Sequence, residues 1–233
     1  AETGLVMIHF KILQCPSSPT PNRFQDKNDS APRKKGAATD YFVPEGVTAA
    51  FDTILPTGET LAAGVAKPGV LEPALATNPA PGNTDISLRT SIESRTTIVS
   101  VTDGTSNTLL IGECAGREDI WRGRVKTAAL ANKSQALCAR ARGGAWGTND
   151  GPYALGTPPL WCNTAGNTAV SAFAGPHKIN ATNEWGSLFY SFHTGSAQFC
   201  FADGSVRSLS ESTRIWTLGA MATRSNGETV GAE

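Results

Sequence analysis

Two residues in the C-terminal part of the chain, His193 and Asp203, could act as a pair of metal ligands or as an acid–base pair. Imidazole nitrogens and carboxylate oxygens are common in both kinds of site. Ten residues of extended strand cover roughly 33 Å, however, so a strand between them would hold the side chains far apart. The spacing therefore favours a histidine hydrogen-bonded at the start of a strand and an aspartate in a turn. A metal-dependent enzyme around His193 is the alternative.

The oxygen-rich stretch from Asp103 to Thr108 is a second candidate site. Asp103 and Asn107 could bind Ca²⁺, which takes carboxylate, amide and backbone oxygens from loops. The stretch lacks the spaced acidic residues of an EF-hand. Aspartate, serine and asparagine side chains in turns also bond to the nearby backbone. We therefore expect a structural turn and no cofactor, with calcium as the alternative.

Tryptophans in loop-like segments are the third candidate. A tryptophan on an exposed loop can stack on a sugar or anchor a protein partner. The same side chain can instead pack under a long loop, which is the interpretation we favour. The four candidates are Trp121, Trp146, Trp161 and Trp185.

Several function classes lack their sequence signals. The chain contains no G-x-S-x-G elbow, no H-E-x-x-H zinc motif and no glycine-rich phosphate loop with a lysine. Its 20 basic and 20 acidic residues balance, so nothing indicates nucleic-acid binding. No apolar run is long enough to span a membrane.

Five cysteines are present, and none forms a C-x-x-C pair. In an oxidising compartment four of them could form two disulfides. Cys138 and Cys162 lie in one loop-rich region and are our preferred pair. Cys200 lies among aromatic residues, where we expect a buried free thiol.

The elements around these candidates are best defined near the C-terminus. Asp203-Gly204 predicts a tight hairpin turn with positive φ at its central residues. Apolar and other residues alternate before this turn, with Ala197, Phe199 and Phe201 on one face. A short amphipathic helix is predicted after the hairpin, from the spacing of Ile215, Leu218, Met221 and Ala222.

Two earlier segments, 95–102 and 109–114, are rich in β-branched or aliphatic residues and predict strands. Together with abundant glycine and proline, these segments predict an α+β fold that is mostly β. We expect one domain over residues 5–233, with long loops at about 16–40, 64–84 and 121–180. Residues 1–4 are expected to be a remnant of secretory cloning.

Four segments together resemble a pseudopilin-like family of unknown function, best known from planctomycete bacteria and associated with prepilin-type processing. Its C-terminal mark is a histidine, nine residues and then Asp-Gly, as in His193 to Gly204. The other similar segments are Leu13–Ser17, Thr102–Glu113 and Asn183–Gly186. The likeness extends from about residue 10 to 228.

The resemblance implies a pilin-like globular head with an antiparallel sheet. Family members usually begin with a long apolar helix that anchors in the membrane and packs in filaments, and we expect this chain to be an ectodomain without it. The family has no established activity, so we expect no catalytic residues. The matching positions are expected to be structural motif residues: Cys15, Asp103, Gly104, Ser106, Asn107, Glu113, His193, Asp203 and Gly204. Ser18 departs from the aspartate that is frequent there.

The expected function is therefore that of a non-enzymatic, exported domain in cell-surface assembly, secretion or extracellular capture. Its location would be the cell surface, the periplasm or the extracellular space. Protein partners or filament subunits are the expected partners, with a glycan also possible, and membrane contact would come only through the missing helix. A carbohydrate- or solute-binding module that uses the loop tryptophans is the first alternative.

Overall fold

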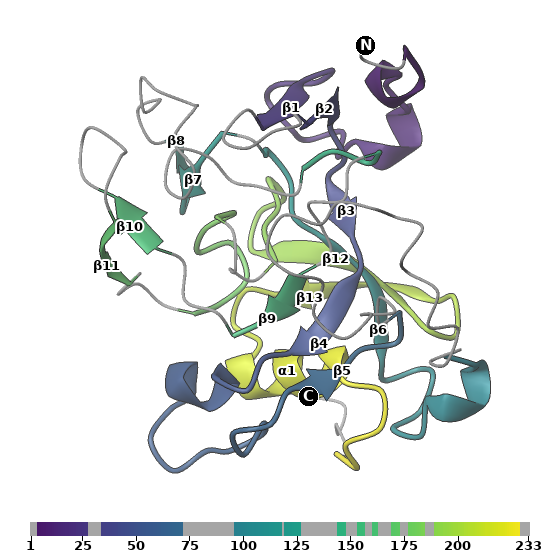
Figure 1. Cartoon of the computed structure of the whole chain (residues 1–233), viewed down its shortest axis with the longest axis vertical. Helices are drawn as coiled ribbons and strands as arrows, with labels where there is room; N and C mark the ends of the chain where they lie inside the picture. The colour runs from purple at the N-terminus through teal and green to yellow at the C-terminus, as the bar shows by residue number, and fades with distance from the viewer. Residues whose placement is uncertain are drawn as a thin grey trace.

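The fold is mostly β, as the sequence predicts, and a four-stranded antiparallel sheet lies at its centre. A computed structural model describes residues 4–27, 34–71, 96–117, 119–126, 144–147, 153–156, 160–162, 169–172, 177–184 and 189–228. The central strands are, in spatial order, β13 (Val206–Ser210), β12 (Ser196–Phe201), β6 (Leu109–Glu113) and β3 (Tyr41–Phe42). Figure 1 shows this sheet between the purple N-terminal segment and the yellow helix α1 (Ile215–Ala222).

Smaller elements complete the described part of the chain. A three-stranded sheet has the order β5 (Lys67–Pro68), β4 (Pro44–Val47) and β9 (Tyr153–Leu155), and its β4–β9 pairing is parallel. The two-stranded pairs are β1 (Phe24–Lys27) with β2 (Lys34–Ala37), β7 (Trp121–Arg122) with β8 (Val125–Lys126), and β10 (Leu160–Cys162) with β11 (Ala169–Ala172). The 3₁₀ helices are η1 (Gly4–Met7), η2 (Lys11–Leu13), η3 (Phe51–Ile54) and η5 (Ile98–Ser100).

The predicted C-terminal hairpin is present as β12 and β13, but its turn differs from the expected one. Gly204 has a φ of 84°, whereas Asp203 does not have positive φ. Gly204 N–H donates to Phe201 O, and Phe201 N–H donates to Ser205 O. This is a three-residue loop that closes with glycine in the left-handed region, so a single positive φ suffices.

The core is formed by the inward face of β12 together with α1 and η3. The alternation predicted for β12 is confirmed, since Ala197, Phe199 and Phe201 are all buried. The predicted helix is confirmed as α1, which packs Leu218 and Ala222 into the same apolar cluster as Phe51. Burial of apolar surface thus fixes which face of the hairpin turns inward.

The prediction of a strand at 95–102 is wrong, because Ile98–Ser100 forms the 3₁₀ helix η5. Ser100 Oγ accepts a hydrogen bond from Thr97 N–H and donates one to Thr97 O. These local bonds compete with strand pairing. Ile98 and Val99 are consequently exposed rather than packed in a sheet.

The long loops expected from composition contain short strands where they are described. Strands β1 and β2 form a hairpin within 16–40, and β7 to β11 lie within 121–180. Backbone pairing holds these short strands. In β1 the polar Gln25 is fully buried, and its side-chain oxygen accepts Gly144 N–H. The loop expected at 64–84 contains β5, and most of its other residues lie outside the described ranges.

Within the described part of the chain, no helix is long and apolar enough to cross a bilayer.

Gly112 in β6 provides a test of core packing. A Cβ atom there would overlap the ring of Phe189, lying 2.5 Å from Cδ1. Phe189 is fully buried and packs edge-on against Phe199, so its ring has little room to move. We expect Gly112→Ala to lower the free energy of unfolding by about 1–3 kcal/mol, measured by urea denaturation.

Gly4→Ala is the matched control, because nothing lies within 4 Å of a Cβ at Gly4. Its effect should stay within about 0.5 kcal/mol. Equal stabilities for the two variants would show that the Phe189 ring does not constrain β6.

Candidate functional site

Three of the predicted motif residues, Cys15, Glu113 and His193, meet at one end of the central sheet. One side-chain donor atom from each lies within 4.8 Å of the other two. His193 Nε2 is 3.6 Å from Cys15 Sγ and 3.6 Å from Glu113 Oε1. Cys15 follows η2, Glu113 ends β6, and His193 precedes β12. Segments that are distant in sequence therefore form a single cluster.

Glu113 is placed by the pairing of β6 with its neighbours. Its backbone pairs with Tyr41 in β3, and Gln198 N–H donates to Glu113 Oε2 at 2.9 Å. The carboxylate is fully buried, and among the described residues Oε1 makes no hydrogen bond of ordinary geometry. Burial raises the pKa of the Glu113 carboxyl group. A hydrogen bond from the Cys15 thiol, a weak donor, partly offsets this rise. A buried carboxylate oxygen without a strong donor is costly.

His193 is held by the loop that leads into β12. Its backbone N–H donates to Ser191 Oγ at 3.1 Å, and Arg124 donates to His193 O at 2.5 Å. On the ring, Nδ1 lies 3.3 Å from Ser17 Oγ. The side chain is 29% exposed, so the cluster reaches solvent through this histidine.

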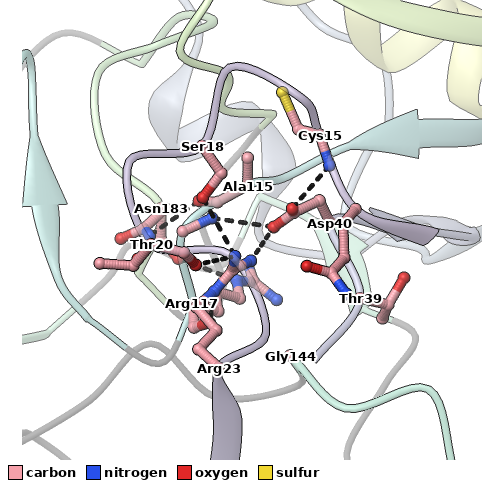
Figure 2. A network of polar contacts seen from close by, with 12 residues as sticks. Cys15, Ser18, Thr20, Arg23, Thr39, Asp40, Ala115, Arg117, Gly144 and Asn183 are labelled. Carbon is pink, nitrogen blue, oxygen red and sulfur yellow. Dashed lines mark hydrogen bonds and ion pairs between the residues drawn. The ribbon is translucent and has the colours of Figure 1, made fainter. Parts of the chain in front are cut away.

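Cys15 is positioned by the buried carboxylate of Asp40. Figure 2 shows Asp40 facing both the Cys15 backbone and the Arg23 guanidinium. Asp40 Oδ2 accepts Cys15 N–H at 2.8 Å, Oδ1 accepts Gly116 N–H at 3.0 Å, and the same carboxylate forms an ion pair with Arg23. Asp40 N–H also donates to Leu13 O at 2.8 Å. One acidic residue thus joins three separate segments.

The Cys15 thiol itself is poorly suited to act as a nucleophile. Burial, and then the neighbouring Glu113 carboxylate, raise the pKa of Cys15 to about 12. A thiolate rather than a thiol is the reactive form, and reactive cysteines have lowered pKa values.

Like Cys15, the other described cysteines, Cys114 and Cys200, form no disulfide within the described part of the chain. Cys114 is buried, whereas Cys200 is only partly buried, which corrects the fully buried position expected for it. The preferred disulfide between Cys138 and Cys162 involves side chains outside the described residues.

The remaining motif residues lie at the other end of the β12–β13 hairpin, and His193 and Asp203 are separated by strand β12. Asp103 Oδ2 accepts Asn226 N–H at 2.8 Å, and Oδ1 accepts Gly227 N–H at 2.9 Å. Each carboxylate oxygen therefore has a backbone donor, but these donors lie in the distant C-terminal segment and not in the nearby backbone expected for a turn. Calcium at this loop stays the alternative.

The turn at Asp103 is closed by the local contacts expected of its residue types. Asn107 N–H donates to Gly104 O at 2.9 Å, and Asn107 Nδ2 donates to Asp103 O at 3.5 Å. Gly104 has a φ of 96°, which a residue with a side chain rarely adopts. Ser106 contributes its carbonyl oxygen, which accepts from Arg207 in β13. These contacts attach the turn to the hairpin.

Asn183 lies in another of the similar segments and is a buried connector that sequence reasoning did not single out. Its Oδ1 accepts Trp121 N–H at 2.9 Å, while Nδ2 donates to Ala115 O and Asp119 O. Its backbone oxygen accepts from Arg117, which is also buried. Asn183 therefore fixes the loop that follows β6.

The candidate tryptophans do not gather into one platform in the described part of the structure. Trp121 is half-buried and packs edge-on against Phe192 at 4.9 Å. Trp146 is exposed, donates from Nε1 to Ile8 O at 2.9 Å and packs edge-on against Phe10. The side chains of Trp161 and Trp185 lie outside the described residues.

The Asp40 network generates a stability prediction. Asp40→Asn should lower the free energy of unfolding by about 3–5 kcal/mol, because it removes the charge that balances the nearly buried Arg23. Urea denaturation measures the effect. Asp119→Asn is the control, since the Asp119–Lys126 ion pair is far more exposed and should contribute at most about 1 kcal/mol. Similar losses in both variants would contradict a central role for Asp40.

Tyr190 generates a pH prediction. Burial raises the pKa of its phenol to about 12, and its hydroxyl donates to Gly123 O at 2.7 Å. An unfolded tyrosine ionises near pH 10. The contribution of the buried, neutral phenol to the free energy of unfolding is therefore complete below about pH 10 and is lost as the pH rises to about 12. Tyr190→Phe should reduce this loss by about 2–3 kcal/mol. Urea denaturation across this pH range measures it, and an unchanged pH dependence would contradict the prediction.

Comparison with known proteins gives one family. A sequence profile described as "Protein of unknown function (DUF1559)" matches residues 3–215. No curated protein and no solved structure matches the chain. The matched range includes Cys15, Glu113 and His193. The chain belongs to the DUF1559 family of proteins of unknown function.

Proposed function

We propose that this chain is the exported, non-enzymatic head of a pilin-like protein, and that it acts in cell-surface assembly by binding a second copy of itself. The resemblance described above supports an exported, filament-associated role. The observation that carries the assembly function is an exposed apolar surface on the N-terminal segment. Secretion and extracellular capture are related roles that would use the same surface.

The N-terminal apolar surface consists of five side chains that a soluble monomer would not ordinarily expose together: Leu5, Ile8, Phe10, Ile12 and Trp146. Leu5 is 71% exposed and Ile12 is 85% exposed. The indole of Trp146 contacts this segment twice: its Nε1 donates to Ile8 O, and its ring packs edge-on against Phe10. Several exposed large apolar side chains on one short segment are a common feature of protein interaction sites.

The location of this surface matches the role that the resemblance implies. In pilin-like proteins the apolar N-terminal helix packs against neighbouring subunits, and the resemblance places that helix immediately before this segment. Figure 1 shows the purple N-terminal segment at the end of the molecule opposite α1. Full burial of one leucine or isoleucine side chain contributes about 1.5–3 kcal/mol. Two such side chains would therefore make a marked contribution to self-association.

Glycan binding by tryptophans stays the alternative function. Among the described tryptophans, Trp146 offers an exposed ring, but Phe10 contacts that ring and the indole N–H is already bonded to Ile8 O. A self-associating surface accounts for the exposed aliphatic side chains around Trp146, whereas a sugar platform does not.

Replacing two of these side chains tests the proposal. Leu5→Asp combined with Ile12→Asp should weaken self-association at least about tenfold, because tenfold corresponds to only about 1.4 kcal/mol. Sedimentation velocity over a wide range of protein concentrations measures the association constant. Because both side chains are highly exposed, we expect the double variant to fold like the unmodified chain.

The control replaces an equally exposed side chain elsewhere. Val99 in η5 is 82% exposed, so Val99→Asp adds one charge and removes one apolar side chain away from the N-terminal segment. It should associate like the unmodified chain. A monomeric wild-type protein at all concentrations, or equal association by the double variant, would overturn the proposal.

A further inference from the structure

We propose that Cys15, Glu113 and His193 bind a transition-metal dication of the Zn²⁺ class. This inference goes beyond assembly at the cell surface and does not rest on it. It uses a thiol, a carboxylate and an imidazole whose donor atoms already lie within 4.8 Å of one another.

The two distances from His193 Nε2 within the cluster are close to those between neighbouring corners of a metal tetrahedron. Zinc bonds of about 2.0–2.3 Å to oxygen, nitrogen and sulfur at tetrahedral angles place adjacent donor atoms about 3.4–3.6 Å apart. His193 Nε2 lies 3.6 Å from both Cys15 Sγ and Glu113 Oε1. A nitrogen–oxygen separation of 3.6 Å is too long for a good hydrogen bond. The Cys15 Sγ–His193 Nε2 separation is within the range of a sulfur hydrogen bond, and one cation between the three atoms would replace that bond and bind Glu113 Oε1 as well.

A nucleophilic Cys–His–acid triad requires a different arrangement. In such a triad the acid contacts the ring nitrogen that faces away from the nucleophile, and thereby orients the imidazole. Here Glu113 and Cys15 both approach Nε2, and Ser17 Oγ lies beside Nδ1. The three donors converge on one point, as metal ligands do.

The surroundings hold each donor in place for a ligand. Ser17 Oγ beside Nδ1 keeps Nε2 of His193 directed at the cluster, the outer-shell contact that metal-bound histidines commonly make. Gln198 N–H donates to Glu113 Oε2, and the weakly donating Cys15 thiol is a further hydrogen-bonding neighbour of this buried carboxylate, so Oε1 has no strong donor among the described residues. Asp40 fixes the backbone of Cys15. The partly exposed His193 provides a route for entry.

The donor set selects the class of metal. Calcium and magnesium take oxygen ligands, whereas thiolate and imidazole favour zinc and similar transition metals. Three protein ligands leave the fourth tetrahedral position for water or another ligand, an arrangement found in zinc sites that are not purely structural. The sequence shows no C-x-x-C or H-E-x-x-H signal because the ligands come from three distant segments.

Metal titration tests the site. The full chain, kept reduced with a non-thiol reductant and freed of metal, is titrated with Zn²⁺ by calorimetry and with Co²⁺ by absorption spectroscopy. We expect one high-affinity ion per chain and a thiolate-to-cobalt charge-transfer band. Cys15→Ser, Glu113→Gln and His193→Gln should each weaken Zn²⁺ binding at least about a hundredfold, since even outer-shell changes cost about 10–100-fold.

Two matched controls use residues of the same types outside the cluster. Cys200→Ser removes a free, partly buried thiol, and His177→Gln removes another partly buried histidine. Both should bind Zn²⁺ like the unmodified chain. Equal weakening by a control and by its matched ligand variant would overturn the assignment.

X-ray absorption at the zinc edge provides a test that requires no variant, in case a ligand substitution prevents folding. The wild-type chain loaded with one Zn²⁺ should show one sulfur in the first shell, with nitrogen and oxygen as the other ligands. A shell with several sulfurs, a shell with none, or no stoichiometric binding by the folded wild type would overturn the proposal.

Discussion

The buried carboxylate of Asp40 is the interaction on which the candidate site depends. It balances the Arg23 guanidinium and accepts backbone N–H groups from Cys15 and Gly116. Burying a charged group is costly unless it is paired and hydrogen-bonded. The buried Asp40 carboxylate therefore needs the ion pair and both backbone hydrogen bonds at the same time. The N-terminal segment and the end of β6 consequently meet in a fixed register, which brings Cys15 beside Glu113.

The antiparallel sheet then determines which motif residues can meet. Strand β6 runs towards the Asp40 end, and β12 starts there and runs away from it. Residues at the end of β6 and just before β12 therefore come together, as Glu113 and His193 do. Residues before β6 and after β12, including Asp103 and Asp203, lie at the opposite end. The sheet topology thus separates the motif residues into two groups. Glu113 and His193 belong to the candidate site at one end, and Asp103 and Asp203 lie in turns at the other.

Sequence reasoning predicted the parts governed by local patterns. Period-two burial in β12 and helical spacing in α1 are set by apolar burial, which short segments record directly. The meeting of Cys15 with His193 depends on long-range pairing and could not be read from spacing. Asp40 carried no local signal, because its role comes from partners in three segments. The prediction of a strand at 95–102 was wrong for a local reason, because hydrogen bonds between Ser100 and Thr97 override the β propensity of the segment.

The proposed metal site and the proposed assembly surface share the N-terminal segment. Cys15 lies two residues after the end of η2, and Ile12 in η2 belongs to the apolar surface. The described contacts that attach this segment include Leu13 O with Asp40 N–H, Ser17 with His193, and Ile8 O with Trp146. A metal ion bound by Cys15, Glu113 and His193 would add a link between the same segment and the sheet. Because coupling between two sites is reciprocal, a metal that orders this segment for assembly would itself be bound more tightly in the assembled state.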